Sequence, residues 1–509
     1  MKKKILALTL CLALLVGPVL SVVAYADTTA DAGYTYDEGT DTYTVTTADG
    51  LVAVANAINA GNLDANVLLA ADIDMTGKTF TPIGISNYYT GKFDGDGHTI
   101  SNLIIDNGGT NRMGIISRAK GSTIKNLTVE SSSITGKDYV GVFVADTHEA
   151  TETVKIENCH AKNVNVKATS SYAVVFATVR HCSVEIRNCT AINATIEATG
   201  DQAGVFACDR GNCPSITIEN SFASGTISSA KNAGGVIGYA CDTVINMKNV
   251  VSLVKATKGV NASSLMANPK RCIVNLDNVI CLDSPIALAD ALGEKRADNA
   301  TISNVFVLAN EDAKLYKSVA LNGTNACTLT INGEAVGADD VAAWQAATVP
   351  AIDIVAASAK IATMFAANDT LKTAALNGLN AMFALDVKAS GMQLLSGTTA
   401  ASEKTSVRLV ITLTSAEVEA LTNVGAYISL TADAKANGIK KSTTAVYTSI
   451  KADDVQVNAE LGTYFVLVEI QNVPNASFGS TIYVTPFVTS EAGEVLGEEI
   501  SFSVTGLIG

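Results

Sequence analysis

Apolar and polar positions repeat along residues 95–310 with a period of about thirty residues. Each repeat carries an aliphatic residue, a charged or polar residue and an asparagine, as in residues 124–126, and a second apolar run upstream, as in residues 141–143. Runs rich in valine, isoleucine and threonine without helical periodicity favour strands. A fixed period of this length is typical of a solenoid, and two or three short strands per turn predict a parallel β-helix.

The repeated asparagine defines one position in each predicted turn. It occurs at Asn102, Asn126, Asn158, Asn188, Asn220, Asn249, Asn278 and Asn304. Stacked turns place equal positions above one another, so each side-chain amide can bond its neighbour and the turn backbone. We therefore predict a structural asparagine ladder.

The residue before the asparagine alternates in charge over six consecutive repeats. These residues are Lys125, Glu157, Arg187, Glu219, Lys248 and Asp277. Opposite charges on adjacent strands attract, whereas a slip by one turn would place like charges side by side. The alternation therefore predicts a structural charge ladder that sets the register of the strands.

The chain begins with the features of a secretory signal peptide. Three lysines at positions 2–4 precede an apolar run over residues 5–23, and Ala24-Tyr25-Ala26 fits the small-x-small cleavage pattern. We assign residues 1–26 to the signal peptide; a retained membrane anchor is the alternative. No second long apolar segment follows, so we expect no membrane insertion after cleavage.

Residues 27–94 are predicted to form an N-terminal cap and the first turn, ahead of repeats over residues 95–340. Asp49 is placed to cap a short helix that ends before Gly61. The apolar residues on one face of this helix are Leu51, Val54, Ala55 and Ile58. An amphipathic helix followed by an extended run over residues 67–73 would cover the open end of the solenoid.

The asparagine repeat stops in the C-terminal third of the chain. Residues 341–394 are alanine-rich in part and form a cap or connector that we leave unassigned. Residues 395–509 return to short strands between polar turns, which predicts a β-sandwich of immunoglobulin-like type. The strands are expected at residues 407–413, 425–431, 464–470, 481–487 and 499–504. A capping-box pattern over residues 414–417 predicts one helical turn between the first two.

Charge and cysteine content narrow the function classes. The formal net charge of −14 becomes −17 once the three signal lysines are lost, which disfavours nucleic acid or an anionic membrane as partner. Nine of the ten cysteines remain in the mature chain, an odd number that argues against a dense disulfide scaffold. Cys159 and Cys189 are expected to be stacked neighbours, and we favour free buried thiols over a disulfide between them.

Three motifs follow one another near the N-terminus: an aspartate-rich strand at residues 71–74, Pro-Ile-Gly at 82–84 and Phe-Asp-Gly-Asp-Gly-His at 93–98. In this order they resemble secreted bacterial β-helix proteins with GLUG-type repeats. The resemblance extends from about residue 45 to 310 and implies a right-handed parallel β-helix. Residues 470–502 are similar to C-terminal modules in exported proteins of Gram-positive anaerobes. Together these resemblances imply surface display, adhesion or matrix binding, and they supply no catalytic residues.

The acidic and histidine residues near one end are candidates for an active site or a calcium site. They are Asp72, Asp74, Asp94, Asp96 and His98. We favour turn chemistry, because glycine supplies unusual backbone angles and aspartate bonds the next amides. The three histidines His148, His160 and His181 occupy different repeat positions. Tyr88 and Tyr89 are the best candidate for an exposed ligand patch, although packing against the N-terminal cap is the competing interpretation.

The sequence thus predicts an all-β protein with a right-handed parallel β-helix, an N-terminal cap helix and a C-terminal β-sandwich. We expect an exported cell-surface or secreted adhesion protein of a Gram-positive bacterium, non-enzymatic and without cofactor or metal. Its partner would be a glycan or an extracellular-matrix or host surface protein. One alternative is a polysaccharide lyase or glycoside hydrolase on a pectin-lyase-like β-helix. A passive structural spacer is the other.

The charge ladder can be tested by reversing one of its members. Lys248→Glu places like charges beside Glu219 and Asp277, and an exposed pair contributes about 0.2–1 kcal/mol. We expect a lower melting temperature, measured by thermal unfolding of the mature chain. An unchanged melting temperature would discard the ladder as a register device.

Overall fold

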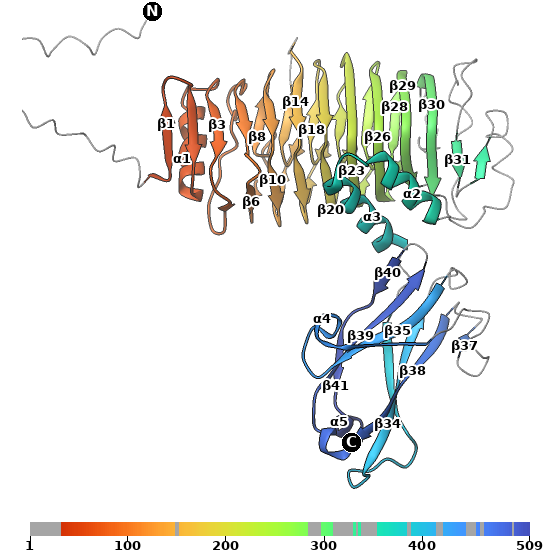
Figure 1. The fold of residues 1–509 in the computed structure, drawn as a ribbon. Coiled ribbons are helices and arrows are strands. Elements are labelled where there is room, and N and C mark those ends of the chain that lie inside the picture. The colour runs from red at the N-terminus through yellow and green to blue at the C-terminus, as the bar shows by residue number, and fades with distance from the viewer. Residues whose placement is uncertain are drawn as a thin grey trace, which may run out of the picture.

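The computed structural model describes residues 32–147, 152–282, 297–308, 329–331, 334–336, 354–383, 388–413, 421–443, 455–458, 463–490 and 493–508. The fold is mostly β, with 51% of residues in strands. A parallel β-solenoid of about eight turns is followed by two antiparallel sheets (Figure 1). The predicted signal peptide, the capping-box turn at residues 414–417 and His148 lie outside the described residues.

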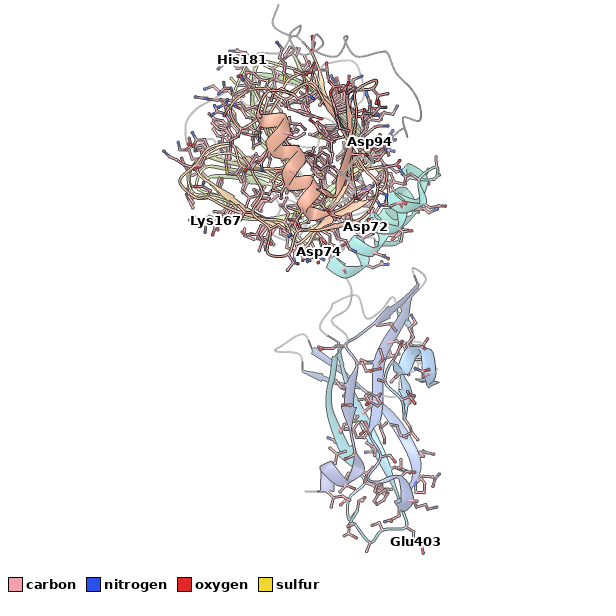
Figure 2. All side chains as sticks on the ribbon, turned by 90° about the vertical axis from the view of Figure 1, so that its left-hand side faces the viewer. Asp72, Asp74, Asp94, Lys167, His181 and Glu403 are labelled. Atoms are coloured by element: carbon pink, nitrogen blue, oxygen red, sulfur yellow. The ribbon has the colours of Figure 1, made fainter. Side chains whose placement is uncertain are left out.

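The N-terminal end of the solenoid is covered by a helix. Strands β1 (Tyr34–Asp37) and β2 (Thr42–Val45) form an antiparallel pair ahead of α1 (Ala48–Asn59). Figure 2 shows α1 lying across the end of the coil. The four apolar residues predicted on one helical face are buried. The N-cap is Thr47 rather than Asp49, because the Thr47 hydroxyl accepts from Gly50 N at 3.1 Å, whereas Asp49 lies in the first turn and pairs with Lys78 at 2.8 Å.

The solenoid wall contains a 21-stranded sheet and two shorter sheets of five and six strands. Strand pairs between successive turns are parallel. In the large sheet, the first row of short strands continues from β2 through β3 (Asn66–Leu69), β5 (Lys92–Asp94), β9 (Thr123–Lys125), β14 (Val154–Glu157) and β19 (Val184–Arg187). The second row contains β4 (Ile73–Asp74), β6 (Thr99–Ser101), β10 (Thr128–Glu130) and β15 (His160–Lys162). The third row contains β7 (Ile104–Asp106), β11 (Ser133–Gly136) and β16 (Asn165–Ala168).

Later turns join these rows into long bent strands. They are β20 (Thr190–Ala198), β23 (Ser215–Ser229), β26 (Val244–Lys258), β29 (Cys272–Leu282) and β30 (Ala297–Leu308). The sheet ends with β31 (Leu329–Ile331), parallel to β30, and β32 (Glu334–Val336), antiparallel to β31. The chain still bends where the rows are joined, because the repeated asparagines inside the long strands keep a left-handed backbone conformation with positive φ.

Two shorter parallel sheets complete the middle turns of the solenoid. The five-stranded sheet consists of β12 (Val140–Gly141), β17 (Ala173–Val174), β21 (Gln202–Gly204), β24 (Asn232–Gly234) and β27 (Asn261–Ser263). The six-stranded sheet consists of β8 (Ile116–Ala119), β13 (Val144–Thr147), β18 (Ala177–Val179), β22 (Ala207–Asp209), β25 (Ile237–Cys241) and β28 (Met266–Lys270). These strands are the second apolar run of the sequence repeat.

The core consists of equal residues stacked along the coil. Phe143, Phe176 and Phe206 are fully buried and stack with ring centroids 5.2 and 4.8 Å apart. Cys159 and Cys189 lie in neighbouring turns, are buried, and are free thiols, as the sequence favoured. Burial, and then the adjacent Cys189, raise the pKa of Cys159. These thiols therefore behave as small apolar core residues.

All eight predicted ladder asparagines adopt the left-handed backbone conformation, with φ between 47° and 58°. Asparagine tolerates this region better than most residues because its short amide can bond locally. Asn158 Nδ2 donates to Asn126 Oδ1 at 3.0 Å, and Asn278 Nδ2 donates to Asn249 Oδ1 at 2.7 Å. Asn249 Nδ2 in turn donates to Asn220 Oδ1 at 2.8 Å. The asparagine thus fixes a bend and joins successive turns.

Asn102, which the sequence frame counted in this row, lies at a different corner. Strand β6, which precedes Asn102, pairs with β10, so Asn102 is level with Ser131. Asn126 instead follows β9, which pairs with β5. The earlier turns have a second left-handed corner, which runs through Asn102, Ser131, Asn163 and Asn193. Asn193 Nδ2 donates to Asn163 Oδ1 at 2.8 Å along this row. Both corners demand the same conformation and therefore produce the same sequence motif. Only the strand register separates them.

Two helices lie along one side of the later turns. They are α2 (Ile354–Met364) and α3 (Asp369–Phe383), within the segment that the sequence left unassigned (Figure 1). Their apolar residues, including Ile361 and Leu379, pack on an outward row that contains Phe222 and Val251. A side chain at Gly378 would lie 2.5 Å from the Phe222 ring, so glycine permits the close approach of α3. The helices cover apolar residues on the outer surface of the solenoid.

The C-terminal part contains two antiparallel sheets, which favour the predicted β-sandwich. One has the order β33 (Lys388–Leu394), β34 (Lys404–Leu413), β38 (Thr463–Pro474) and β37 (Val455–Asn458). The other has the order β36 (Ile439–Thr443), β35 (Leu421–Ser429), β39 (Ile482–Ser490) and β40 (Gly493–Leu496), with β41 (Ile500–Phe502) on β39. Short helices are α4 (Ala434–Asn437), η4 (Asn475–Ser477) and α5 (Val504–Ile508). Strand β33 precedes residue 395, the start expected from sequence, and pairs with β34.

The two roles of the ladder asparagine can be separated at Asn249, whose amide both donates and accepts. Asn249→Gly keeps the left-handed backbone but loses the amide bonds, at a net cost of about 1–2 kcal/mol. Asn249→Ala adds left-handed strain of about 1–2 kcal/mol. Thermal unfolding should rank wild type above the glycine variant and the glycine variant above the alanine variant. An alanine variant as stable as the glycine variant would contradict the backbone role.

Candidate functional site

The strand register brings the alternating charges together as neighbours along one row. Glu157 lies between Lys125 and Arg187, and Arg187 lies between Glu157 and Glu219. The row continues with Lys248 and Asp277. Arg187 Nε is 2.9 Å from Glu219 Oε2, and Lys248 Nζ is 3.8 Å from Asp277 Oδ2. The contribution of this row to register stays a prediction.

Asp94 extends the charge row by one turn beyond the residues that sequence identified. Its side chain is 13% exposed and its carboxylate accepts from Asn126 Nδ2 at 3.0 Å. Lys92 Nζ and Lys125 Nζ both lie 3.1 Å from Asp94 Oδ2. Burial raises the pKa of Asp94, but the hydrogen bonds from Lys125 and Asn126 outweigh it and hold the pKa at about 2. Asp94 is therefore an ionised anchor at the first turn.

The remaining acidic residues at this end are bound to turns. Asp72 accepts from Thr99 N at 2.9 Å and lies 3.2 Å from His98 Nδ1. Asp74 accepts from Asn102 Nδ2 at 2.9 Å and from Thr76. Figure 2 shows Asp94 apart from Asp72 and Asp74. In the part of the chain that the structure describes, no three His, Cys, Asp or Glu side chains are grouped to hold a metal ion.

Tyr89 cannot form the ligand patch suggested with Tyr88, because its side chain is fully buried. Its strand segment bridges to Ala119, and Tyr89 N donates to Arg118 O at 2.9 Å, so the ring points into the solenoid core. Tyr88 is half-buried. The structure favours the competing interpretation, a turn that packs against the N-terminal cap, because Gly84 N donates to Asn59 Oδ1 of α1 at 2.8 Å and Thr90 N donates to Leu63 O at 2.9 Å. His160, which contacts Thr190 at 2.9 Å, lies on the second strand row and apart from His181.

A cluster that the sequence analysis did not identify lies at another corner of the solenoid. We call it the arginine–tyrosine corner; it consists of Arg112, Tyr139, Tyr172, Arg180 and Arg210. The guanidinium carbons of the three arginines lie 5.3, 5.9 and 5.5 Å from the centroid of the Tyr139 ring. The Tyr139 and Tyr172 rings stack 5.0 Å apart at an interplanar angle of 12°. Guanidinium groups over an aromatic ring are attracted by its negative face.

The strand register explains why these residues meet. Met113 bridges to Val140, and Val140 pairs with Ala173, so the preceding residues 112, 139 and 172 form one row along the coil. Arg180 and Arg210 directly follow β18 and β22, which pair in the adjacent sheet. The three row residues have φ of 67°, 58° and 65°. Such angles are unusual for arginine and tyrosine and cost about 1–3 kcal/mol each.

One buried carboxylate faces the corner. Asp146 is 1% exposed, and Arg112 Nε donates to its Oδ2 at 2.7 Å. Arg180 Nε lies 3.8 Å from Asp146 Oδ1, which is beyond hydrogen-bonding distance. Burial raises the pKa of Asp146 despite the hydrogen bond from Arg112. Among the described residues, the buried atoms Arg180 Nε and Gln202 Oε1 lack hydrogen-bond partners.

Comparison with known proteins identifies no family. No protein-family model matches the chain. The chain is 35% identical over 136 residues to halomucin of Haloquadratum walsbyi. The aligned region covers 25% of this chain and 1% of halomucin. A crystal structure of a putative immunoglobulin A1 protease from Bacteroides ovatus aligns with a TM-score of 0.39 and 17% identity, over 64% of this chain and 88% of that chain. None of the described helices is long and apolar enough to cross a membrane.

The structural role of Asp94 predicts a pH-dependent stability difference. Because its folded pKa is depressed to about 2, its ionised form stabilises the fold above the unfolded pKa near 4, and this contribution is lost as the pH falls through about 2. Asp94→Asn should lose about 1–2 kcal/mol at pH 7, and the difference from wild type should disappear by about pH 2.

The measurement for Asp94 is denaturant unfolding at several pH values. Asp96→Asn removes the same charge from the exposed neighbouring turn and serves as the control. A pH-independent difference, or an equal loss in both variants, would contradict the anchoring role.

Proposed function

We propose that this chain is an exported surface or secreted protein that binds a ligand through its β-solenoid without chemically changing it. The observation that supports this proposal is the arginine–tyrosine corner. Here three guanidinium groups lie near one tyrosine ring, and a single buried carboxylate, that of Asp146, faces them. A solenoid fixed by stacked corners can hold such side chains in place before a ligand arrives. Preorganisation of this kind lowers the entropic cost of binding.

Export is proposed from the sequence of residues 1–26 and the acidic charge of the mature chain. The similarity to halomucin supports a surface or secreted repeat protein. To this proposal we add a right-handed coil with GLUG-type repeats and an immunoglobulin-like C-terminal module from a Gram-positive bacterium. These assignments follow the sequence resemblances. The domain boundaries proposed from sequence are part of the same assignment.

Binding is favoured over polysaccharide cleavage because the candidate carboxylates are used in the scaffold. Asp72 and Asp74 accept hydrogen bonds from turns, and Asp94 is held by Lys92 and Lys125. A lyase or hydrolase needs an acid and a base free to transfer protons to and from its substrate. The enzyme hypothesis and the passive spacer are the two alternatives that an experiment must separate from binding.

The test applies the mature chain, residues 27–509, to an array of glycans and extracellular-matrix proteins, with soluble products assayed in parallel. We expect saturable binding without product release. Release of shortened glycan or peptide would overturn the proposal in favour of an enzyme. Absence of both binding and products would overturn it in favour of a structural spacer.

A further inference from the structure

We propose that the arginine–tyrosine corner recognises an acidic saccharide, meaning a sugar ring that carries a carboxylate or sulfate. This inference rests on the proposed binding function and specifies its ligand and its residues. It starts from the charge balance at the corner. The ring of Tyr139 is surrounded by Arg112, Arg180 and Arg210, whereas the hydrogen-bonded carboxylate at this cluster is Asp146.

The other carboxylates around the corner have partners of their own. Asp138 Oδ1 accepts from Ser171 N at 2.9 Å, and Asp201 pairs with Lys231 at 2.5 Å. Asp209 accepts hydrogen bonds from the Thr243 hydroxyl at 2.7 Å and from the Cys213 thiol at 2.8 Å. A fourth arginine, Arg118, is paired in register with Asp146, and its Nη1 donates to Ser86 O at 2.9 Å. The guanidinium charge at the corner therefore exceeds the carboxylate charge that contacts it.

Two of the arginines are incompletely paired within the protein. Arg210 is exposed and, among the described residues, forms no ion pair. Arg180 is 9% exposed and lies 3.8 Å from Asp146, but its buried Nε has no hydrogen-bond partner in the described part of the chain. A planar guanidinium can donate two parallel hydrogen bonds to a carboxylate or a sulfate. A bound oxyanion would satisfy both side chains, whereas a neutral ligand would leave the excess charge in place.

The aromatic and amide groups favour a sugar over an acidic peptide as the carrier of that anion. Tyr139 and Tyr172 form a stacked pair in which Tyr139 is buried and Tyr172 is half-buried, so Tyr172 is the ring that can contact a ligand. An aromatic ring can pack against the apolar C–H face of a sugar while its hydroxyl bonds a polar group. Gln202, level with Tyr172 in the next turn, is 8% exposed, and its buried Oε1 has no hydrogen-bond partner among the described residues. This oxygen would accept a hydrogen bond from a sugar hydroxyl that reaches it. An acidic side chain of a peptide has no such hydroxyl.

The negative net charge of the chain allows binding at the corner to be distinguished from nonspecific attraction of a polyanion. With a formal net charge of −17 after loss of the three signal lysines, the mature chain repels polyanions at long range. Binding of an acidic glycan would therefore have to come from a local cluster of positive charge. It should depend on the arginines of that cluster and not on arginines elsewhere along the solenoid.

The experiment measures dissociation constants of residues 27–509 for polygalacturonate, which carries carboxylates, and for dextran sulfate, which carries sulfates. Unmodified dextran and polyglutamate are the comparison polymers. We expect one or both acidic glycans to bind, with neither dextran nor polyglutamate reaching a comparable affinity. The polygalacturonate and dextran sulfate arms identify which anion the corner accepts.

The matched variants are Arg180→Gln, Arg210→Gln and Arg271→Gln. Arg271 follows β28, two strands beyond β22 in the same sheet, and pairs with Asp242 at 2.5 Å. Its replacement therefore removes the same charge from a neutralised arginine outside the five-residue corner. We expect each of the first two variants to weaken acidic-glycan binding at least tenfold and Arg271→Gln to leave it within twofold. Arg210 is exposed, so its variant tests the site even if Arg180→Gln lowers the melting temperature.

Three results would overturn the acidic-saccharide site. They are equal losses in all three variants, polyglutamate binding with the same dependence on Arg210, and binding of only neutral glycans or matrix proteins in the array. The last result would leave the proposed binding function standing. Absence of any ligand would remove both.

Discussion

The left-handed backbone corner, repeated in every turn, is the constraint on which the solenoid depends. At Asn249 a single side chain meets two requirements, because asparagine tolerates a φ of 53° and its amide bonds the asparagines of the turns before and after it. A corner fixed in this way determines where the next strand begins. The inward position of Ile186 and the outward position of Arg187 in β19 then follow from the two-residue period of a strand. Packing and surface charge are both consequences of this backbone geometry.

The period could be predicted from sequence because each turn imposes the same conformational demand on the same residue type. The sequence-based predictions were wrong where two residues or two corners fit the same local pattern. Asn102 fits the asparagine motif but serves the second corner, and only hydrogen bonding between β6 and β10 reveals this. Thr47 and Asp49 are both good capping residues, and the choice depends on which side chain reaches the Gly50 amide. Helices α2 and α3 were not predicted as cover because their partners, such as Phe222, look like ordinary core residues.

The arginine–tyrosine corner could not be predicted for a different reason. Its five residues come from segments spread between residues 112 and 210, and they are adjacent only because strands β12, β17, β18 and β22 stack in register. At this corner arginine and tyrosine occupy the left-handed conformation, although neither type signals it as asparagine does. The one sequence feature that pointed to the corner was that Tyr139 and Tyr172 occupy the same position ahead of the second apolar run of their repeats. This feature predicts that the two tyrosines are neighbours, but it does not predict the arginines that approach them from the adjacent sheet.

Arg187 and Arg210 show how the same side chain can serve the fold in one place and a ligand in another. Arg187 contacts both Glu185 and Glu219, so its charge is neutralised within the wall and contributes to pairing between turns. The Arg210 guanidinium lies 5.5 Å from the centroid of the Tyr139 ring, and among the described residues no carboxylate pairs with it. Unneutralised charge normally destabilises a fold, because like charges held together repel. The corner can retain it because the asparagine rows and apolar core fix the backbone independently. An anion that binds at the corner relieves the repulsion between the guanidinium groups, and this relief favours binding. We therefore place recognition at this corner and not along the charge ladder, where the charges are already neutralised.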